Sequence, residues 1–432
     1  MADSPDPPAR GTGRPARIRS GSVAAGPGRR RRGRALGVAL ALAALAALLA
    51  VAVAIVIVVL HQAQPPHPGS FYSAPSPLPT GAPGTIIRSE PLDHLPAGTQ
   101  GWKILYLSTG YTGKPAAISG VVIVPTTPPP RDGRKVVAWA HGTVGVAARC
   151  APSILADAGA SAIDGLPAFL AAGDAVVATD YQGLGTPGPH PYLVGKDEAI
   201  AVLDSVRAAH NLPRAAAGTT FVVWGASQGG HAALFTGQYA SSYAPDLTLA
   251  GVAAAAPAAA LLPLFQRSIG KDFGNVLSAF AIDSWAQVYP ALSLDQIVSP
   301  LARPLVRNAA TYCIQNMTQA LPAVLHARIL KLVYLSKPPW ETEPWKGVLE
   351  TNTAGHMPIR APIFIGQGAE DMLVRPDVQA TVVKGLCAAG ETVQYRTYPS
   401  VDHLGAGPAA TPDVTAWIAD RFAGKPAPRA CG

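Results

Sequence analysis

Short apolar runs alternate with helical segments along the chain from about residue 86. Most of seven such runs are apolar on both faces, as in central strands of a parallel sheet that is covered on both sides. The predicted strands are Ala117–Pro125, Lys135–Gly142, Ala175–Gly183, Thr219–Ser227, Leu249–Pro257, Pro362–Gly368 and Val393–Pro399. Segments with helical spacing of apolar residues, such as Lys196–Leu212, lie between them. The alternation predicts one α/β domain over residues 85–432, with a mostly parallel, doubly wound sheet.

The interval between Pro257 and Pro362 breaks this rhythm. It contains no convincing strand, yet it holds nine of the 28 aromatic residues of the chain. Insertions into an open α/β sheet follow strand C-termini, over the crevice where ligands bind. Residues 258–350 are therefore predicted to form a helical cap over the site. The alternative is a packed helical decoration without substrate contact.

The longest apolar run, residues 36–60, contains no charged residue. As a helix it would be about 37 Å long, which is enough to cross a bilayer core with some tilt. Residues 35–60 are therefore predicted to be an uncleaved transmembrane signal anchor. A cleaved signal, which would release the rest of the chain, is the alternative.

Residues 1–34 carry nine arginines and two aspartates, so +7 of the formal net charge of +8 lies in this segment. By the positive-inside rule this segment is predicted to be a basic cytoplasmic tail, with the domain outside the cytoplasm. No aromatic residue precedes Phe71 to stack on bases, so nucleic acid is not an expected partner.

Residues 61–84 contain seven prolines and no charged residue. Such a composition favours extended, polyproline-like conformations. We interpret this segment as a linker between the predicted anchor and the domain.

All four cysteines follow the predicted anchor, at Cys150, Cys313, Cys387 and Cys431. None belongs to a C-x-x-C pair, so zinc-binding and redox motifs are not indicated. An even number in an exported chain suggests two disulfides, for which three pairings are possible.

A serine flanked by glycines ends one of the predicted strands, in the stretch "GASQGG" at Gly225–Gly230. A G-x-S-x-G pattern alone is a weak signal, but here a strand, a sharp turn and the start of a helix follow one another. In such a nucleophile elbow a side chain at Gly225 or Gly229 would clash with the turn. The context predicts Ser227 as a nucleophile, which needs a base to take its proton.

The base is expected to be a histidine that comes last in the chain, with the acid between it and the serine. His403 fits, because it follows the last predicted strand in a glycine-containing loop. His141, His231 and His356 are the alternatives. His231 lies in the first turn of the helix after the serine, where the dipole disfavours positive charge, so a structural role is expected for it.

The acid is expected directly after the penultimate strand, where Glu370 and Asp371 lie. We favour Asp371, because a G-x-x-D sequence there projects the carboxylate toward the histidine. Asp402 is too close in sequence to His403 to face its ring easily, so we interpret it as a solvated loop acid. The ordered set Ser227, Asp371 and His403 is the predicted triad.

Two backbone donors are needed for the oxyanion that forms when the serine attacks. One is expected from the N–H of Gln228, directly after the serine. The other is expected from the loop after an earlier strand, where Gly142 permits close approach and Thr143 offers an N–H and a hydroxyl. A plain β-to-α turn is the alternative interpretation of this loop.

Several short motifs of the chain occur together in one known family. They are "AHGT" (140–143), "CAPS" (150–153), "ATDYQGLG" (178–185), "GASQGG" (225–230), G-x-x-D (368–371) and "DH" (402–403). By these motifs the chain from about Ile86 to Cys431 resembles the secretory lipase family of α/β-hydrolases, typified by fungal lipase A.

The resemblance implies an α/β-hydrolase fold with a helical cap between nucleophile and acid. It implies Ser227, Asp371 and His403 as the triad and Gln228 as an oxyanion donor. It also implies the disulfides Cys150–Cys313 and Cys387–Cys431. Secreted members of the family have cleavable signals, and the long apolar segment of this chain departs from that pattern.

These features predict an extracytoplasmic serine hydrolase that cleaves carboxylic esters, in particular lipid or acylglycerol esters, without a metal or organic cofactor. An acyltransferase with the same triad is one alternative, because the outcome depends on whether water or an alcohol reaches the acyl-enzyme. A serine peptidase is less expected, since nothing marks a pocket for a peptide terminus. A catalytically silent, anchored binding module is the alternative from another class.

Overall fold

The computed structural model describes residues 38–51, 58, 64–429 and 431. The chain divides into two compact units, Met1–Val59 and Leu60–Gly432. In the first unit, residues 38–51 are helical. The predicted cytoplasmic tail, residues 1–34, lies outside the described residues, as does part of the predicted anchor at 35–60. No helix within the described residues is both long and apolar enough to cross a membrane, so the predicted transmembrane anchor is not supported.

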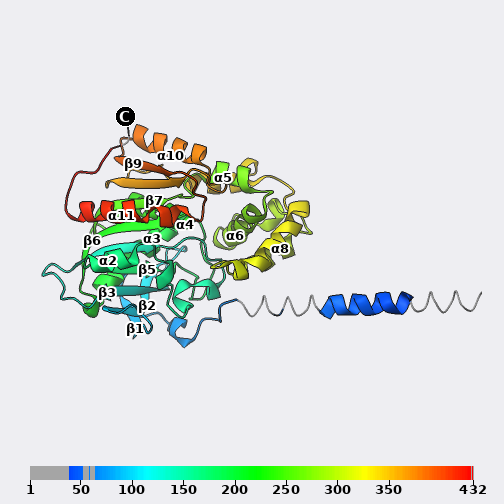
Figure 1. Ribbon diagram of the computed structural model, residues 1–432, viewed down its shortest axis with the longest axis horizontal. Coiled ribbons are helices and arrows are strands. Elements are labelled where there is room, and N and C mark those ends of the chain that lie inside the picture. Colours follow the sequence, from blue (N-terminus) through cyan, green and yellow to red (C-terminus); the bar gives the residue numbers. More distant parts are fainter. Residues whose placement is uncertain (1–37, 52–57, 59–63, 430, 432) are drawn as a thin grey trace, which may run out of the picture. The chain divides into compact units, whose positions relative to one another are not determined.

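A nine-stranded sheet runs through the described part of the second unit, in the order β1-β2-β3-β5-β4-β6-β7-β8-β9 (Figure 1). Six neighbouring strands are parallel. They are β5 (Ala175–Thr179), β4 (Arg134–Ala140), β6 (Ala217–Ala226), β7 (Thr248–Ala255), β8 (Ile363–Gly368) and β9 (Val393–Tyr398). An antiparallel meander extends one edge, formed by β1 (Ile86–Pro91), β2 (Thr99–Thr109) and β3 (Pro115–Pro125). All seven predicted strands are confirmed, whereas β1 and β2 were not predicted.

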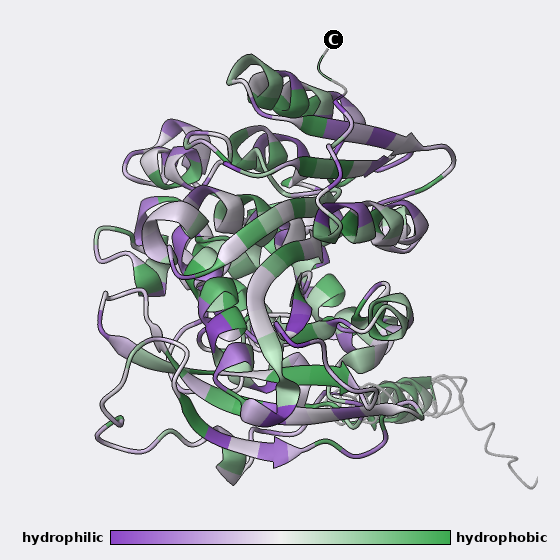
Figure 2. Cartoon of the chain, turned by 90° about the vertical axis from the view of Figure 1, so that its left-hand side faces the viewer, coloured by the Kyte–Doolittle hydropathy of each residue, from purple (hydrophilic) through white to green (hydrophobic). Residues whose placement is uncertain are grey.

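Helices cover both faces of the sheet. One face packs against α3 (Gly195–His210), α4 (Gln228–Tyr243) and α10 (Pro376–Ala388). The other face packs against α2 (Leu166–Ala171) and α11 (Ala406–Phe422). Successive strand residues point to opposite faces, so in β6 Val223 belongs to the first core and Val222 and Trp224 to the second. Hydrophobic colours accordingly dominate the strands in the middle of the sheet (Figure 2).

The chain between β7 and β8 folds as helices with a core of their own. They are α5 (Leu261–Ser268), α6 (Asp272–Val288), α7 (Arg303–Ala309), α8 (Met317–Val333) and α9 (Trp345–Thr351). Phe280, Trp285 and Trp345 lie at the centre of this core and are fully buried. The helical character predicted for residues 258–350 is therefore confirmed, and the aromatic enrichment of the interval reflects its separate core. Its role as a cap stays a prediction.

The proline-rich segment packs against the domain from Gln64 onward. Phe71 and Tyr72 are buried against Leu105 of β2 and Ala117 of β3. The side chain of Gln64 accepts a hydrogen bond from the N–H of Cys313 (2.7 Å). The interpretation of residues 61–84 as a linker is therefore wrong for 64–84, because burial of two aromatic side chains fixes this segment to the sheet edge.

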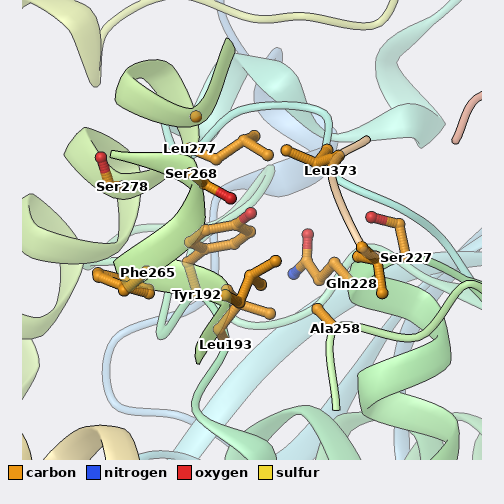
Figure 3. A pocket seen from close by; sticks show the side chains of 13 residues that line it. Tyr192, Leu193, Ser227, Gln228, Ala258, Phe265, Ser268, Leu277, Ser278 and Leu373 are labelled. Carbon is orange, nitrogen blue, oxygen red and sulfur yellow. The ribbon is translucent and has the colours of Figure 1, made fainter. Parts of the chain in front are cut away.

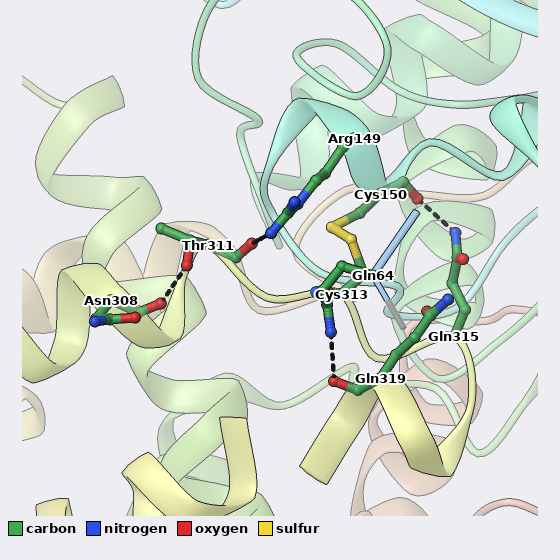
Figure 4. Close-up of a disulfide and its surroundings, with 8 residues drawn as sticks. All are labelled: Gln64, Arg149, Cys150, Asn308, Thr311, Cys313, Gln315 and Gln319. Carbon is green, nitrogen blue, oxygen red and sulfur yellow. Dashed lines mark hydrogen bonds between the residues drawn. A yellow bond between two sulfur atoms is a disulfide. The ribbon is translucent and has the colours of Figure 1, made fainter. Parts of the chain in front are cut away.

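Two disulfides are present, Cys150–Cys313 and Cys387–Cys431. They are the pairings that the family resemblance implies. The first links the connection between β4 and α2 to the helical segment, across 163 residues of sequence (Figure 4). Gln64 and Gln315 lie beside it, and Gln315 Nε2 donates to the carbonyl of Cys150 (2.8 Å).

Candidate active site

Ser227 lies in a sharp turn between β6 and α4. Its backbone has φ 56° and ψ −116°, a conformation that costs a non-glycine residue about 1–3 kcal/mol. Glycines beside it make the turn possible, because a Cβ at Gly225 or Gly229 would collide with the carbonyl oxygen of Ala140. The structure therefore has the strand–turn–helix geometry that the sequence predicts for a nucleophile elbow.

Three predicted residues are joined by hydrogen bonds in series. His403 Nε2 lies 2.9 Å from Ser227 Oγ, and His403 Nδ1 lies 2.8 Å from Asp371 Oδ2. His403 comes from the loop between β9 and α11, and Asp371 follows β8. A neutral imidazole with its proton on Nδ1 donates to the carboxylate and accepts from the serine hydroxyl. This arrangement can move the serine proton to the histidine.

Asp371 is held in place by neighbours that the sequence did not indicate. Its carboxylate is buried, and Oδ1 accepts the backbone N–H groups of Leu373 and Val374 (2.8 Å each). The side-chain amide of Gln367 donates to Oδ2 (3.1 Å), the oxygen that faces His403. Donors to both oxygens fix the orientation of the carboxylate toward the imidazole.

The alternative histidines are engaged elsewhere. Both ring nitrogens of His141 face carbonyl oxygens, those of Gly142 (2.7 Å) and Asp180 (3.3 Å), and burial lowers the pKa of this histidine. His231 bonds to Glu198 and to the carbonyl of Asn352, so it has the structural role expected of it. His356 is exposed.

The alternative acids also lie away from the imidazole. Glu370 is exposed. Asp402 is exposed as well, and it accepts the N–H of Gly405 (2.9 Å), as a solvated loop acid would.

The predicted oxyanion residues lie around Ser227. Gln228 is the first residue of α4, where backbone N–H groups have no partner within the helix. Gly142 and Thr143 line the same cavity as Ser227 and His403. The hydroxyl of Thr143 is bonded to the hydroxyl of Tyr192 (2.8 Å), so its side chain is occupied and its N–H is the candidate donor. The choice between Gly142 and Thr143 stays a prediction.

A buried polar cluster lies beneath the first turn of α4. Glu198 accepts from the side-chain amide of Gln228 (2.8 Å), from the ring of His231 (2.7 Å) and from the N–H of Leu193 (3.1 Å). His190 lies 3.3 Å from the Gln228 amide, and burial lowers the pKa of His190 to about 3, so it is neutral. Sequence reasoning missed Glu198, because a glutamate in the first turn of a helix is read as a surface acid.

Two cavities meet at Ser227. The first is largely apolar and runs from Ser227 and Gln228 at one end to Phe265 and Ser278 at the other (Figure 3). The second contains His403, Thr143 and Asp164. Ser227, Leu277 and Leu373 line both. Ser227 thus lies at the boundary between the two cavities.

No cluster of three or more histidine, cysteine, aspartate or glutamate side chains able to hold a metal ion occurs in the part of the chain that the structure describes.

The sequence is similar to one protein family and to several proteins described as lipases. The sequence pattern of the secretory lipase family matches residues 163–430. A Mycobacterium tuberculosis protein described as a probable inactive lipase is 26% identical over 385 residues, which cover 84% of this chain and 83% of the relative. Lipase 6 of Candida albicans is 25% identical over 409 residues, covering 86% and 85% respectively. A secreted triacylglycerol lipase of Malassezia globosa is 26% identical over 380 residues, covering 82% and 79%.

Solved structures agree on the fold. Candida antarctica lipase A in its closed state has a TM-score of 0.71 and 22% identity, covering 85% of this chain and 89% of that chain. A rice cell wall degrading esterase from Xanthomonas oryzae has a TM-score of 0.63 and 20% identity, covering 79% and 98%. Both likenesses show the α/β-hydrolase fold.

Proposed function

Because the chain belongs to the secretory lipase family, we propose that it hydrolyses lipid esters with Ser227 as nucleophile, His403 as base and Asp371 as the orienting acid. The observation that carries this proposal is the unbroken series of hydrogen bonds from Ser227 through His403 to Asp371. A serine without a base is a poor nucleophile, whereas a serine in this series is activated.

The reaction takes two steps. Ser227 Oγ attacks the ester carbonyl while His403 Nε2 takes the hydroxyl proton, and the resulting imidazolium returns that proton to the leaving alcohol. Water then attacks the acyl-enzyme with the same histidine as base, which releases the acid and restores Ser227. Asp371 accepts the Nδ1–H of His403 and stabilises the imidazolium.

The tetrahedral oxyanion is stabilised by backbone donors. We assign one to the N–H of Gln228, which lies at the positive end of the α4 dipole. The second is assigned to the loop with Gly142 and Thr143. Removing a donor of this kind typically costs about 10²–10³ in kcat.

The catalytic domain is assigned to a compartment outside the cytoplasm. Two disulfides support this, because such bonds persist mainly in oxidising compartments. The match to a family of secretory lipases supports it as well.

The test uses the full chain with p-nitrophenyl esters from acetyl to palmitoyl, beside Ser227→Ala. Turnover by the wild type that is lost in the variant is expected, and the profile over chain length separates a lipase from a short-chain esterase. Absence of turnover on every ester, together with no labelling by a fluorophosphonate probe in a folded protein, contradicts the proposal and supports a silent binding module. Labelling without turnover supports an acyltransferase.

A further inference from the structure

The position of His403 decides which cavity holds which part of an ester. The histidine must hand its proton to the oxygen of the leaving alcohol, so the alcohol part lies on the His403 side of the serine. Only one of the two cavities at Ser227 contains His403 among its lining residues. We call this cavity, with His403, Asp164 and Pro408 in its wall, the alcohol cavity. This step rests on the proposed function.

Asp164 is a fixed part of the alcohol cavity. It precedes α2, and the indole N–H of Trp224 donates to its main-chain oxygen (3.0 Å). Its carboxylate points toward the first turn of α11, since Asp164 Oδ2 is the nearest atom to a Cβ built on Gly407. The backbone of Asp164 is therefore held independently of its carboxylate, and a substitution at the carboxylate leaves this anchor intact.

The Asp164 carboxylate has no partner within the part of the chain that the structure describes. No hydrogen bond or ion pair to it occurs among the described residues, and burial raises its pKa to about 6. Asp157 in the same connection shows the contrast, because its carboxylate accepts the N–H groups of Gly159 and Ser161 and its pKa is lowered. Hydrogen bonds within its own turn thus hold the Asp157 carboxylate and lower its pKa. The Asp164 carboxylate has no equivalent bonds among the described residues.

The negative charge of Asp164 is also not balanced by a positively charged side chain among the described residues of the cavity walls. No lysine or arginine is among the described residues that line the alcohol cavity or the larger cavity beside it, which shares Gly142, Thr143 and Leu404 with it. The dipole of α11 favours a carboxylate near its first turn. An ionised carboxylate in a partly enclosed space acts on nearby charges more strongly than one in bulk water.

We propose that Asp164 is a specificity-determining residue that selects esters by the charge of their alcohol part. It favours a cationic alcohol, such as an amino alcohol, over a neutral one of the same shape, and it disfavours an anionic alcohol. The selection acts where the alcohol must approach His403. It therefore changes kcat/KM for charged esters and leaves neutral esters as the reference.

The experiment compares butyrate esters of three alcohols of similar bulk: choline (cationic), 3,3-dimethylbutanol (neutral) and hydroxypivalate (anionic). Acid release is followed by titration at about pH 8, above the pKa of Asp164, with the full-length wild type and Asp164→Asn. The quantity is the ratio of kcat/KM for a charged ester to that for the neutral ester. A general effect of the substitution on His403 cancels in this ratio.

In Asp164→Asn the cationic-to-neutral ratio is expected to fall about ten-fold, or ~1.4 kcal/mol in transition-state free energy, and the anionic-to-neutral ratio to rise. Equal ratios in both proteins overturn the role of Asp164 but leave the proposed function intact. Failure of the wild type to hydrolyse even the neutral ester, without fluorophosphonate labelling, contradicts the proposed function itself.

Asp402→Asn is the matched control, because it removes an exposed carboxylate beside His403 that does not line the alcohol cavity. Its ratios are expected to equal those of the wild type. If Asp164→Asn does not fold, the wild type alone decides. Lowering the pH from about 8 to about 5 protonates the Asp164 carboxyl, whose pKa is about 6, and is expected to lower the cationic-to-neutral ratio. A ratio that stays the same overturns the proposal.

Discussion

His231 Nδ1 lies 2.7 Å from Glu198 Oε2, and both side chains are fully buried beneath the first turn of α4. His231 Nε2 faces the carbonyl of Asn352 (2.8 Å), so it must carry a proton. A second proton must lie between Nδ1 and the carboxylate, because two acceptors would otherwise face each other. The pair therefore joins α3, α4 and the end of the helical segment through one buried, fully bonded contact.

Replacing Glu198 by glutamine is expected to destabilise the protein. The change leaves His231 and the amide of Gln228 without a charged acceptor in a buried site. Breaking such a pair typically costs about 3–5 kcal/mol in the free energy of unfolding. Denaturant titration measures this cost, with Glu370→Gln as the control because Glu370 is exposed. A loss no larger than that of the control would show that the cluster is not structural.

Gly229→Ala is expected to prevent formation of the elbow. A Cβ there overlaps the carbonyl of Ala140, and neither the strand end nor the helix start can shift without disturbing Ser227. Loss of soluble protein, or of fluorophosphonate labelling in whatever protein folds, is the expected result. Gly385→Ala in α10 is the matched control, because a Cβ at Gly385 meets nothing within 4 Å. That control is expected to be stabilised by about 0.5–1 kcal/mol in thermal or denaturant unfolding.

Asp371→Asn is expected to lower kcat by about 10⁴-fold with little change in KM. Asparagine fills the same space, but it presents an amide to His403 and no longer stabilises the imidazolium. Asp371 also accepts two backbone N–H groups, so the thermal unfolding midpoint of the variant must be measured beside kinetics on a p-nitrophenyl ester. A folded variant with near wild-type kcat would remove Asp371 from the triad.

The strands, and the meeting of Ser227, His403 and Asp371 in one series of hydrogen bonds, could be predicted because local sequence and chain order determine them. The central strands are apolar on both faces, since Val222 and Val223 each enter a core. The elbow requires glycine at fixed offsets from Ser227, and chain order alone separates His403 from the other histidines.

Features that depend on distant partners could not be predicted. Strand β2 includes Lys103 and Gln100 among apolar residues and is defined mainly by its pairing with β3. The side-chain contacts of Glu198 and Gln367 come from other elements or from a later turn. The packing of the proline-rich segment could not be predicted either. Its proline content indicated a linker, and Phe71 and Tyr72 are its only aromatic residues.

Phe71→Ala tests the corrected view of that segment. Phe71 is 5% exposed and packs against Leu105 and Ala117, so truncation leaves a cavity at the sheet edge. A loss of about 3–5 kcal/mol in the free energy of unfolding is expected. Ser73→Ala, at an exposed position of the same segment, is expected to have little effect. Equal stability of the two variants would restore the interpretation of residues 64–84 as a spacer.

The stability of the helical segment is expected to depend on pH through Asp283 in α6. Burial raises the pKa of this carboxyl from its ordinary value near 3.8 to about 6, although Arg307 and Gln287 oppose the change. Between these pH values the folded protein holds a proton that the unfolded chain has lost. The contribution of this proton to the free energy of unfolding is therefore fully present below about pH 4 and is lost as the pH rises through 6. The loss amounts to at most about 3 kcal/mol in the free energy of unfolding, from 1.36 kcal/mol per pKa unit.

Asp283→Asn removes this dependence, because the amide carries no charge and its oxygen can still accept from Gln287 Nε2, which lies 2.8 Å from the carboxylate. The variant is expected to match the wild type near pH 4 and to be more stable near pH 8. Denaturant unfolding at both pH values measures the difference, with Asp132→Asn correcting for removal of one exposed negative charge. A variant that is less stable than the wild type at the higher pH would mean that Arg307 compensates the buried charge fully, so that ionised Asp283 stabilises the fold instead of opposing it.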